Sequence, residues 1–183
     1  MRLNFLALIK LISLLVFFAI VIYTDLRWRK IPNRITIGFA IEGIILLVFN
    51  KGWNGILLGI AAFMFGAVLL LLPFLLGGIG AGDVKMMGTI GVFLVSAGYL
   101  IIVWACLVSM VFGGLIAIIA SLRKNKLLAS VRNAMWELFS LVFGAPALRR
   151  FNKNRENNDI DYIPYSLALV LGTLTVVCWL WYM

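Results

Sequence analysis

The hydrophobic residues of this chain lie in long runs that are separated by short polar segments. Several runs approach the roughly 20 residues that an α-helix needs to cross about 30 Å of hydrocarbon. The pattern predicts an all-α, polytopic membrane protein. Its six transmembrane helices are expected at about residues 3–24, 35–49, 55–76, 86–95, 99–122 and 165–182.

Residues 86–122 decide the number of spans. As one straight helix they would extend about 55 Å, nearly twice the thickness of the hydrocarbon. Two spans joined by a turn at Ser96-Ala97-Gly98 fit better, although the first of them is short.

The ends of the first three spans carry further signals. Lys10 interrupts the run after Arg2, and no A-x-A-like cleavage site follows, so residues 3–24 are expected to be a retained helix and not a signal peptide. Pro32 and Asn33 suit the start of the second helix. Gly55 and Gly59 have GxxxG spacing, which favours close helix packing inside the protein over a dimer interface.

Composition agrees with a single membrane domain over residues 1–183. The chain is 64% hydrophobic and its mean hydropathy is +1.10, far above the values of soluble domains. The formal charge of +9 does not indicate a nucleic-acid partner, because lysine and arginine in membrane proteins mark cytoplasmic loops and meet anionic lipid.

The distribution of charge predicts the topology. With six spans, one face carries 13 of the 16 basic residues, and the positive-inside rule makes that face cytoplasmic. We therefore expect a multi-pass protein of the cytoplasmic (inner) membrane with both termini outside. The 13 residues are Arg27, Arg29, Lys30, Arg34, Lys85, Arg123, Lys124, Lys126, Arg132, Arg149, Arg150, Lys153 and Arg155. Within the last basic loop, residues 127–143 have one apolar helical face and are expected to form an interfacial amphipathic helix.

The candidate chemistry rests on carboxylates. The chain has no histidine, which excludes Ser-His-Asp hydrolysis and HExxH zinc chemistry. Cys106 and Cys178 stand apart in apolar runs without CxxC spacing, so no zinc site and no structural disulfide are expected.

The segment Gly77–Lys85 is unusual for a membrane protein. Four glycines in six residues disfavour a helix, and an aspartate, Asp83, follows them. A carboxylate at membrane depth is costly and is therefore a functional candidate that needs a partner.

Asp25 is the proposed partner. It closes the first span and Asp83 opens the fourth, and because two spans lie between them, both acids emerge on the same side. Two carboxylates that are close together cannot both ionise readily, so one can act as acid and the other as base. Such a pair can activate water to attack an amide without a metal or cofactor. From the residues alone, ion or proton transport is favoured over catalysis, because acids within membranes more often serve transport.

Three motifs resemble those of type IV prepilin leader peptidases. Residues 25–33, Asp-Leu-Arg-Trp-Arg-Lys-Ile-Pro-Asn, resemble the family's D-x-R-x-x-x-I-P-N stretch, with Pro32 and Asn33 at its end. Residues 80–85, which contain Gly80, Gly82, Asp83 and Lys85, resemble the G-x-G-D-x-K motif, whose GxGD core is shared with presenilin-type intramembrane aspartyl proteases. Residues 163–172, with Pro164, resemble the I-P-[FY]-x-x-x-[LA]-x-x-G start of the family's last helix.

The resemblance implies an aspartic endopeptidase that removes the basic leader of prepilins or prepilin-like proteins at the cytoplasmic membrane face. Asp25 and Asp83 would be its catalytic pair, with the roles of acid and base left open. The chain lacks the N-terminal region with paired CxxC zinc cysteines that larger members carry, so it is similar to the short, peptidase-only form.

Two other ionisable residues have open roles. Lys85 could act on the acid pair or the substrate, but anchoring of a helix end is the favoured interpretation. Glu42, two turns into the second span, could tune the pair or serve as a hydrogen-bonded packing residue. The competing functions are a small proton- or ion-coupled transporter and a non-catalytic assembly scaffold; peptide cleavage that depends on both aspartates separates the peptidase from either.

Overall fold

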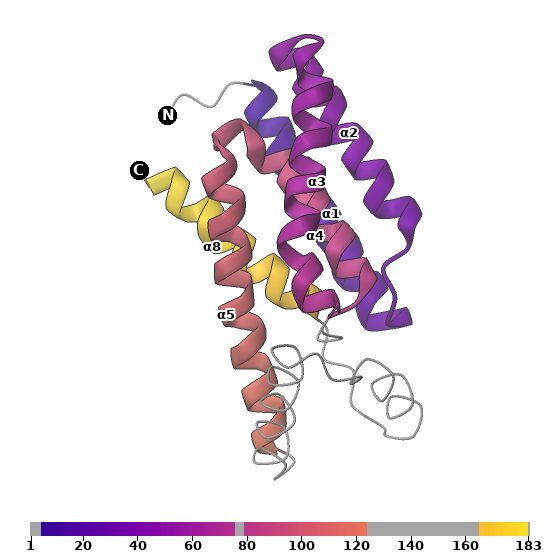
Figure 1. The fold of residues 1–183 in the computed structure, drawn as a ribbon, viewed down its shortest axis with the longest axis vertical. Helices are drawn as coiled ribbons and strands as arrows, with labels where there is room; N and C mark the ends of the chain where they lie inside the picture. Colours follow the sequence, from indigo (N-terminus) through magenta and orange to yellow (C-terminus); the bar gives the residue numbers. More distant parts are fainter. Residues whose placement is uncertain (1–4, 76–78, 124–164, 183) are drawn as a thin grey trace.

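The computed structural model describes residues 5–75, 79–123 and 165–182. These residues form six α-helices and one 3-10 helix, and no strand is found among them. Figure 1 shows the helices as a bundle in which the beginning of α1 and the end of α8 lie toward the same end. The helices are α1 (Phe5–Trp28), α2 (Asn33–Lys51), α3 (Asn54–Leu75), α4 (Ala81–Leu94), η1 (Val95–Ala97), α5 (Tyr99–Arg123) and α8 (Tyr165–Tyr182).

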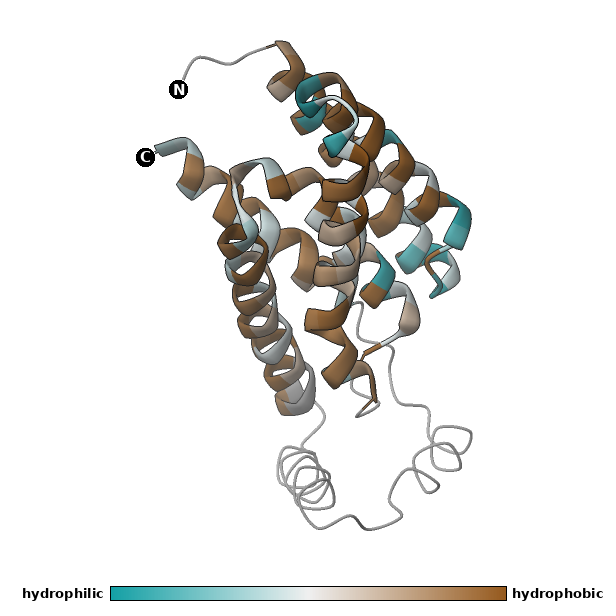
Figure 2. Ribbon diagram, turned by 45° about the horizontal axis from the view of Figure 1, so that its top comes forward, coloured by the Kyte–Doolittle hydropathy of each residue, from teal (hydrophilic) through white to brown (hydrophobic). Residues whose placement is uncertain are grey.

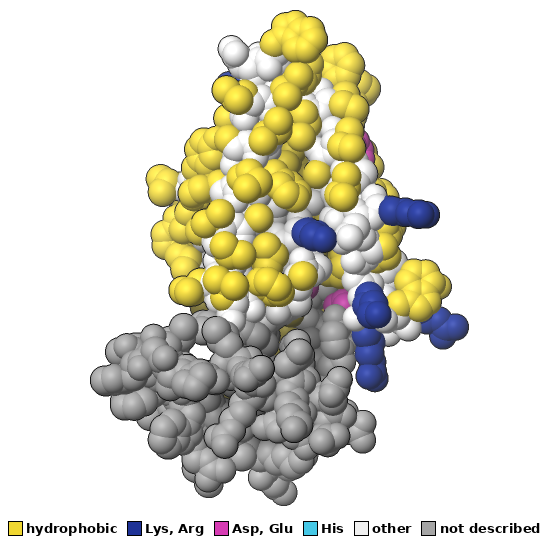
Figure 3. Space-filling model, turned by 45° about the vertical axis from the view of Figure 1, so that its right-hand side comes forward, with side chains coloured by type: hydrophobic (Ala, Val, Ile, Leu, Met, Phe, Trp, Pro, Cys, Tyr) yellow, Lys and Arg dark blue, Asp and Glu magenta, His cyan; other side chains and the backbone are white. Residues whose placement is uncertain are grey.

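Five of these helices are long and apolar enough to cross a membrane: α1, α2, α3, α5 and α8. Figure 2 shows that these helices consist mostly of hydrophobic residues. On the face drawn in Figure 3, most of the visible Lys and Arg side chains lie toward one end of the described residues. The chain is therefore a membrane protein. The expected interfacial helix at 127–143 lies outside the described residues, and the count of six spans stays a prediction.

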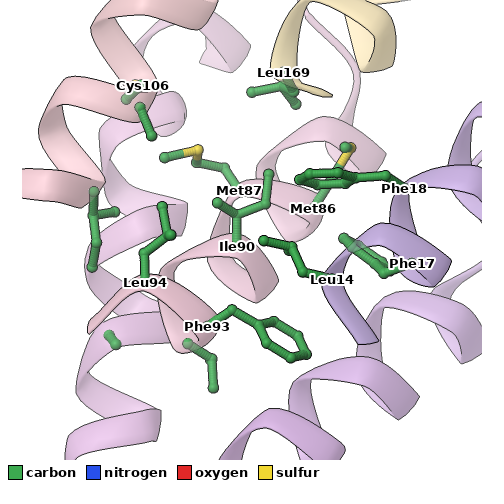
Figure 4. Close-up of a cluster of buried hydrophobic side chains, with 14 of the residues drawn as sticks. Leu14, Phe17, Phe18, Met86, Met87, Ile90, Phe93, Leu94, Cys106 and Leu169 are labelled. Carbon is green, nitrogen blue, oxygen red and sulfur yellow. The ribbon is translucent and has the colours of Figure 1, made fainter. Parts of the chain in front are cut away.

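The short fourth helix is the centre of the fold. Ten of the 14 residues of α4 are buried, and α4 contacts α1, α2, α3, α5 and α8. Met86, Met87 and Ile90 of α4 meet Phe17 of α1 and Leu169 of α8 in the hydrophobic core (Figure 4). At 1.5 Å per residue this helix extends only about 21 Å, less than the hydrocarbon thickness.

Close contact between α3 and α4 depends on small residues. A Cβ atom at Gly66 would lie 2.5 Å from the carbonyl oxygen of Met87, and one at Gly91 would lie 2.6 Å from that of Ala62. Small residues at such an interface let two backbones approach each other within a membrane.

The GxxxG pair packs inside the protein, as expected. A Cβ atom at Gly55 would lie 2.6 Å from the backbone of Leu47, and one at Gly59 would lie 2.6 Å from the side chain of Ile44. Both contacts are with α2, so this motif joins α2 to α3.

Two of the predicted helix boundaries were wrong. The first helix was expected to end at residue 24, but α1 continues to Trp28 and is closed by Arg29, whose φ of 53° is left-handed and whose N–H donates to Asp25 O at 2.9 Å. The fourth helix was expected to begin at residue 86, but α4 begins at Ala81. The glycine-rich segment therefore becomes helical sooner than its composition suggested, since Asp83 caps the new helix.

Candidate active site

Asp25 lies in the last turn of α1 and is fully buried. Its Oδ2 atom accepts a hydrogen bond from the hydroxyl of Ser166, which lies in the first turn of α8 and is fully buried as well. A buried carboxylate needs such partners, because its removal from water is otherwise very costly. The position of Asp25 thus depends on a helix that is distant in the sequence.

Asp83 lies in the first turn of α4, and only 6% of it is exposed. The backbone N–H of Gly80 donates to Asp83 Oδ2 at 3.0 Å, and the N–H of Asp83 donates to the carbonyl oxygen of Gly80 at 3.1 Å. An acidic side chain at the third helical position that reaches back to the N-cap is one half of a capping box, and the helix dipole favours its charge. The local backbone of α4 therefore orients Asp83.

Asp25 and Asp83 belong to helix ends that lie in the same part of the bundle. The end of α1 and the beginnings of α4 and α8 lie in the same part of the bundle (Figure 1), and contacts join α1 to α4, α1 to α8 and α4 to α8. A pair of carboxyl groups is suited to general acid–base chemistry on a bound water.

Gly80 and Gly82 leave room for the Asp83 carboxylate and for the side chain of Ile31, respectively. A Cβ atom at Gly80 would lie 3.3 Å from Asp83 Oδ2, so a side chain there would crowd the carboxylate. A Cβ atom at Gly82 would lie 3.1 Å from Ile31 Cβ. Ile31 thus packs onto the first turn of α4, a contact that links two of the sequence motifs.

Further contacts join the start of α2, at Pro32 and Asn33, to Lys85 of α4. Pro32 is the N-cap of α2, with φ −64° and ψ 131°, and Asn33 begins the helix, as expected. The side chain of Lys85 donates to Asn33 Oδ1 at 2.8 Å. One turn further along α4, Thr89 Oγ1 donates to the carbonyl oxygen of Thr36 at 3.0 Å. The structure therefore favours the interpretation of Lys85 as an anchor of its helix.

Glu42 belongs to a different part of the bundle. Its Oε1 atom accepts a hydrogen bond of 2.5 Å from Ser13 Oγ, and the nearby Lys10 side chain donates to Ser96 Oγ at 2.8 Å. At 1.5 Å per residue, Ser13 lies about 18 Å from Asp25 along α1. This geometry favours a hydrogen-bonded packing role for Glu42.

Ser166 and Ile31 belong to the site, although the sequence alone assigned no role to either residue. Ser166 follows the Ile-Pro-Tyr motif as a polar residue at the start of an apolar run, which is the one signal that could have singled it out. Pro164, the expected motif residue before Ser166, lies outside the described residues.

In the described part of the chain, no three His, Cys, Asp or Glu side chains come together as they would around a metal ion.

Comparison with known proteins places the chain in a family. The family model for the type IV leader peptidase family matches residues 12–120, which is more than half of the 183 residues and includes both aspartates. No match was found among curated proteins or among solved structures. Because the family match covers more than half of the sequence, the chain belongs to the type IV leader peptidase family.

Proposed function

We propose that the protein is an aspartic endopeptidase that cleaves the basic leader peptide from type IV prepilins or prepilin-like proteins. The observation that carries the proposal is the placement of two buried acids, Asp25 at the end of α1 and Asp83 at the start of α4, on helices that contact each other. Membership of the leader peptidase family supports a peptide substrate.

The proposed reaction uses a water molecule bound between the two carboxyl groups. One carboxylate takes a proton from the water as it attacks the scissile carbonyl, and the other carboxyl group protonates the departing nitrogen. Partial exclusion of bulk water strengthens the electrostatic interactions at this site. Because the aspartates are held by different helices, the reaction depends on the packing of α1 against α4.

The proposed site opens toward the cytoplasmic face. Arg27, Arg29, Lys30 and Arg34 follow Asp25 in the sequence, and Lys85 follows Asp83, so the positive-inside rule makes this end cytoplasmic. Both termini would then be extracytoplasmic. The substrate partner would be the apolar helix of a prepilin with its basic leader at the membrane surface, and lipids would surround the remaining faces.

A cleavage assay with matched acid variants tests the proposal. Purified protein in lipid nanodiscs is incubated with a prepilin, and the shortened product is measured by mass spectrometry. Asp25→Asn and Asp83→Asn are each expected to reduce cleavage by at least about 10³-fold, because each removes one proton-transfer group.

Glu42→Gln is the control, since it neutralises another acid of the bundle whose partner Ser13 can still donate to the new amide. It is expected to retain cleavage within about threefold of the wild type. Cleavage at the wild-type rate in either aspartate variant would remove that residue from the proposed catalytic pair.

A further inference from the structure

We propose that Ser166 is a positioning residue that fixes the orientation of the Asp25 carboxylate relative to Asp83. This inference rests on the proposed peptidase function of the two aspartates. The Ser166 hydroxyl donates to Asp25 Oδ2, and neither residue is exposed to solvent. A hydrogen bond between two buried polar groups fixes their mutual position, because leaving either group unpaired is costly.

The two aspartates are held in different ways. Asp83 is oriented by the N–H of Gly80, three residues away in its own helix. Asp25 instead accepts a hydrogen bond from Ser166, which is 141 residues away in the sequence, on α8. The mutual geometry of the pair therefore depends on the placement of α8 as well as on α1 and α4.

Packing against α5 sets the position of α8 independently of Asp25. A Cβ atom at Gly172 would overlap Ser109, whose hydroxyl donates to the carbonyl oxygens of Ala105 at 2.6 Å and Leu169 at 3.4 Å. At the start of α8, the ring of Tyr165 lies against Gly113, where a Cβ atom would be 2.5 Å from the ring. These contacts hold the first turn of α8 and place the Ser166 hydroxyl beside Asp25.

The sequence motifs of the chain do not specify a residue type at position 166. In the pattern I-P-[FY]-x-x-x-[LA]-x-x-G, Ser166 falls on the first unspecified position. It also lies beyond residues 12–120, the segment matched by the family model. The role of Ser166 is therefore inferred from the hydrogen bond of this chain.

The kinetic test compares Ser166→Ala with Thr173→Val. Thr173 is a second fully buried hydroxyl of α8, and it donates to the carbonyl oxygen of Leu169 at 2.7 Å, within its own helix. Ser166→Ala is expected to lower kcat on a prepilin by about 10- to 100-fold with little change in KM, because displacement of a reacting group affects the chemical step. Thr173→Val is expected to leave kcat unchanged, and Ser166→Thr, which keeps the hydroxyl, is expected to restore most of it.

A spectroscopic measurement tests the hydrogen bond without a substrate. The carboxyl band of Asp25 is identified in pH-difference infrared spectra of the full chain by its loss in Asp25→Asn. This band is expected to shift in Ser166→Ala and to stay in place in Thr173→Val. Thermal unfolding of each variant confirms that it is folded.

The outcomes separate this inference from the proposed function. A wild-type protein that cleaves no prepilin contradicts the proposed function, while the infrared band still decides whether Ser166 holds Asp25. An unshifted band, a wild-type kcat in Ser166→Ala, or equal losses in Ser166→Ala and Thr173→Val would overturn the inference.

Discussion

Lys85 of α4 donates a hydrogen bond of 2.8 Å to the side chain of Asn33, the first residue of α2. These residues come from two separate motifs, and the bond lies two residues beyond Asp83. It joins the start of α2 to the helix that carries one of the proposed catalytic acids.

The first prediction concerns this bond. Asn33→Ala and Lys85→Ala should each lower the free energy of unfolding by about 0.5–1.5 kcal/mol, the range of a single hydrogen bond near the surface. The double variant should be less destabilised than the sum, because the second substitution removes a bond that is already lost. A double-mutant cycle of thermal unfolding in detergent measures the coupling, and strictly additive losses would contradict it.

The second prediction concerns the contact between Ile31 and Gly82. Gly82→Val should destabilise the protein by about 1–3 kcal/mol, because the added side chain must displace Ile31 from the first turn of α4. Adding Ile31→Ala in the same chain should recover part of this loss, since it removes the Cγ1 and Cδ1 atoms that lie 3.4 Å from the new Cβ. Denaturation midpoints of the three variants check this, and an unchanged midpoint for Gly82→Val would show that the contact is unimportant.

The third prediction concerns the interface between α3 and α4. Gly66→Ala should destabilise the protein by about 1–3 kcal/mol, since the new Cβ meets the backbone of Met87, which cannot move independently of α4.

Gly114→Ala is its matched control, because Gly114 lies in α5 with nothing within 4 Å of its added Cβ. This control should be neutral or stabilising by up to about 1 kcal/mol, as alanine favours the helix more than glycine does. Thermal unfolding of both variants is the measurement, and the prediction is rejected if they change stability equally.

The fourth prediction concerns Ser13 and Glu42. Ser13→Ala should lower the free energy of unfolding by about 1–3 kcal/mol, because the part-buried Glu42 loses the donor that accompanies it within the bundle. Prepilin cleavage by the folded variant should stay at the wild-type rate, since this pair lies in a different part of the bundle from the aspartates. A loss of cleavage without a loss of stability would instead indicate that Glu42 tunes the aspartate pair.

The sequence predicted the helices more closely than it predicted their junctions. The spans at 35–49, 55–76 and 99–122 match α2, α3 and α5 to within about two residues at each end, the usual uncertainty of a helix end. The end of α1 and the start of α4 were missed, because Arg29 and Asp83 close or cap these helices through hydrogen bonds that hydropathy does not detect.

What the sequence determined by itself was the set of apolar helices and the placement of Asp25 and Asp83 at one end of the bundle. The length of each apolar run can be read directly from the sequence and compared with the thickness of the bilayer. The number of spans between the two acids then fixes the side of the membrane on which each acid emerges. Only the tertiary structure decided that α4 lies at the centre, that Ile31 packs on Gly82 and that Ser166 holds Asp25. Those contacts join residues far apart in the chain, and they arise from the packing of whole helix faces, which no local pattern specifies.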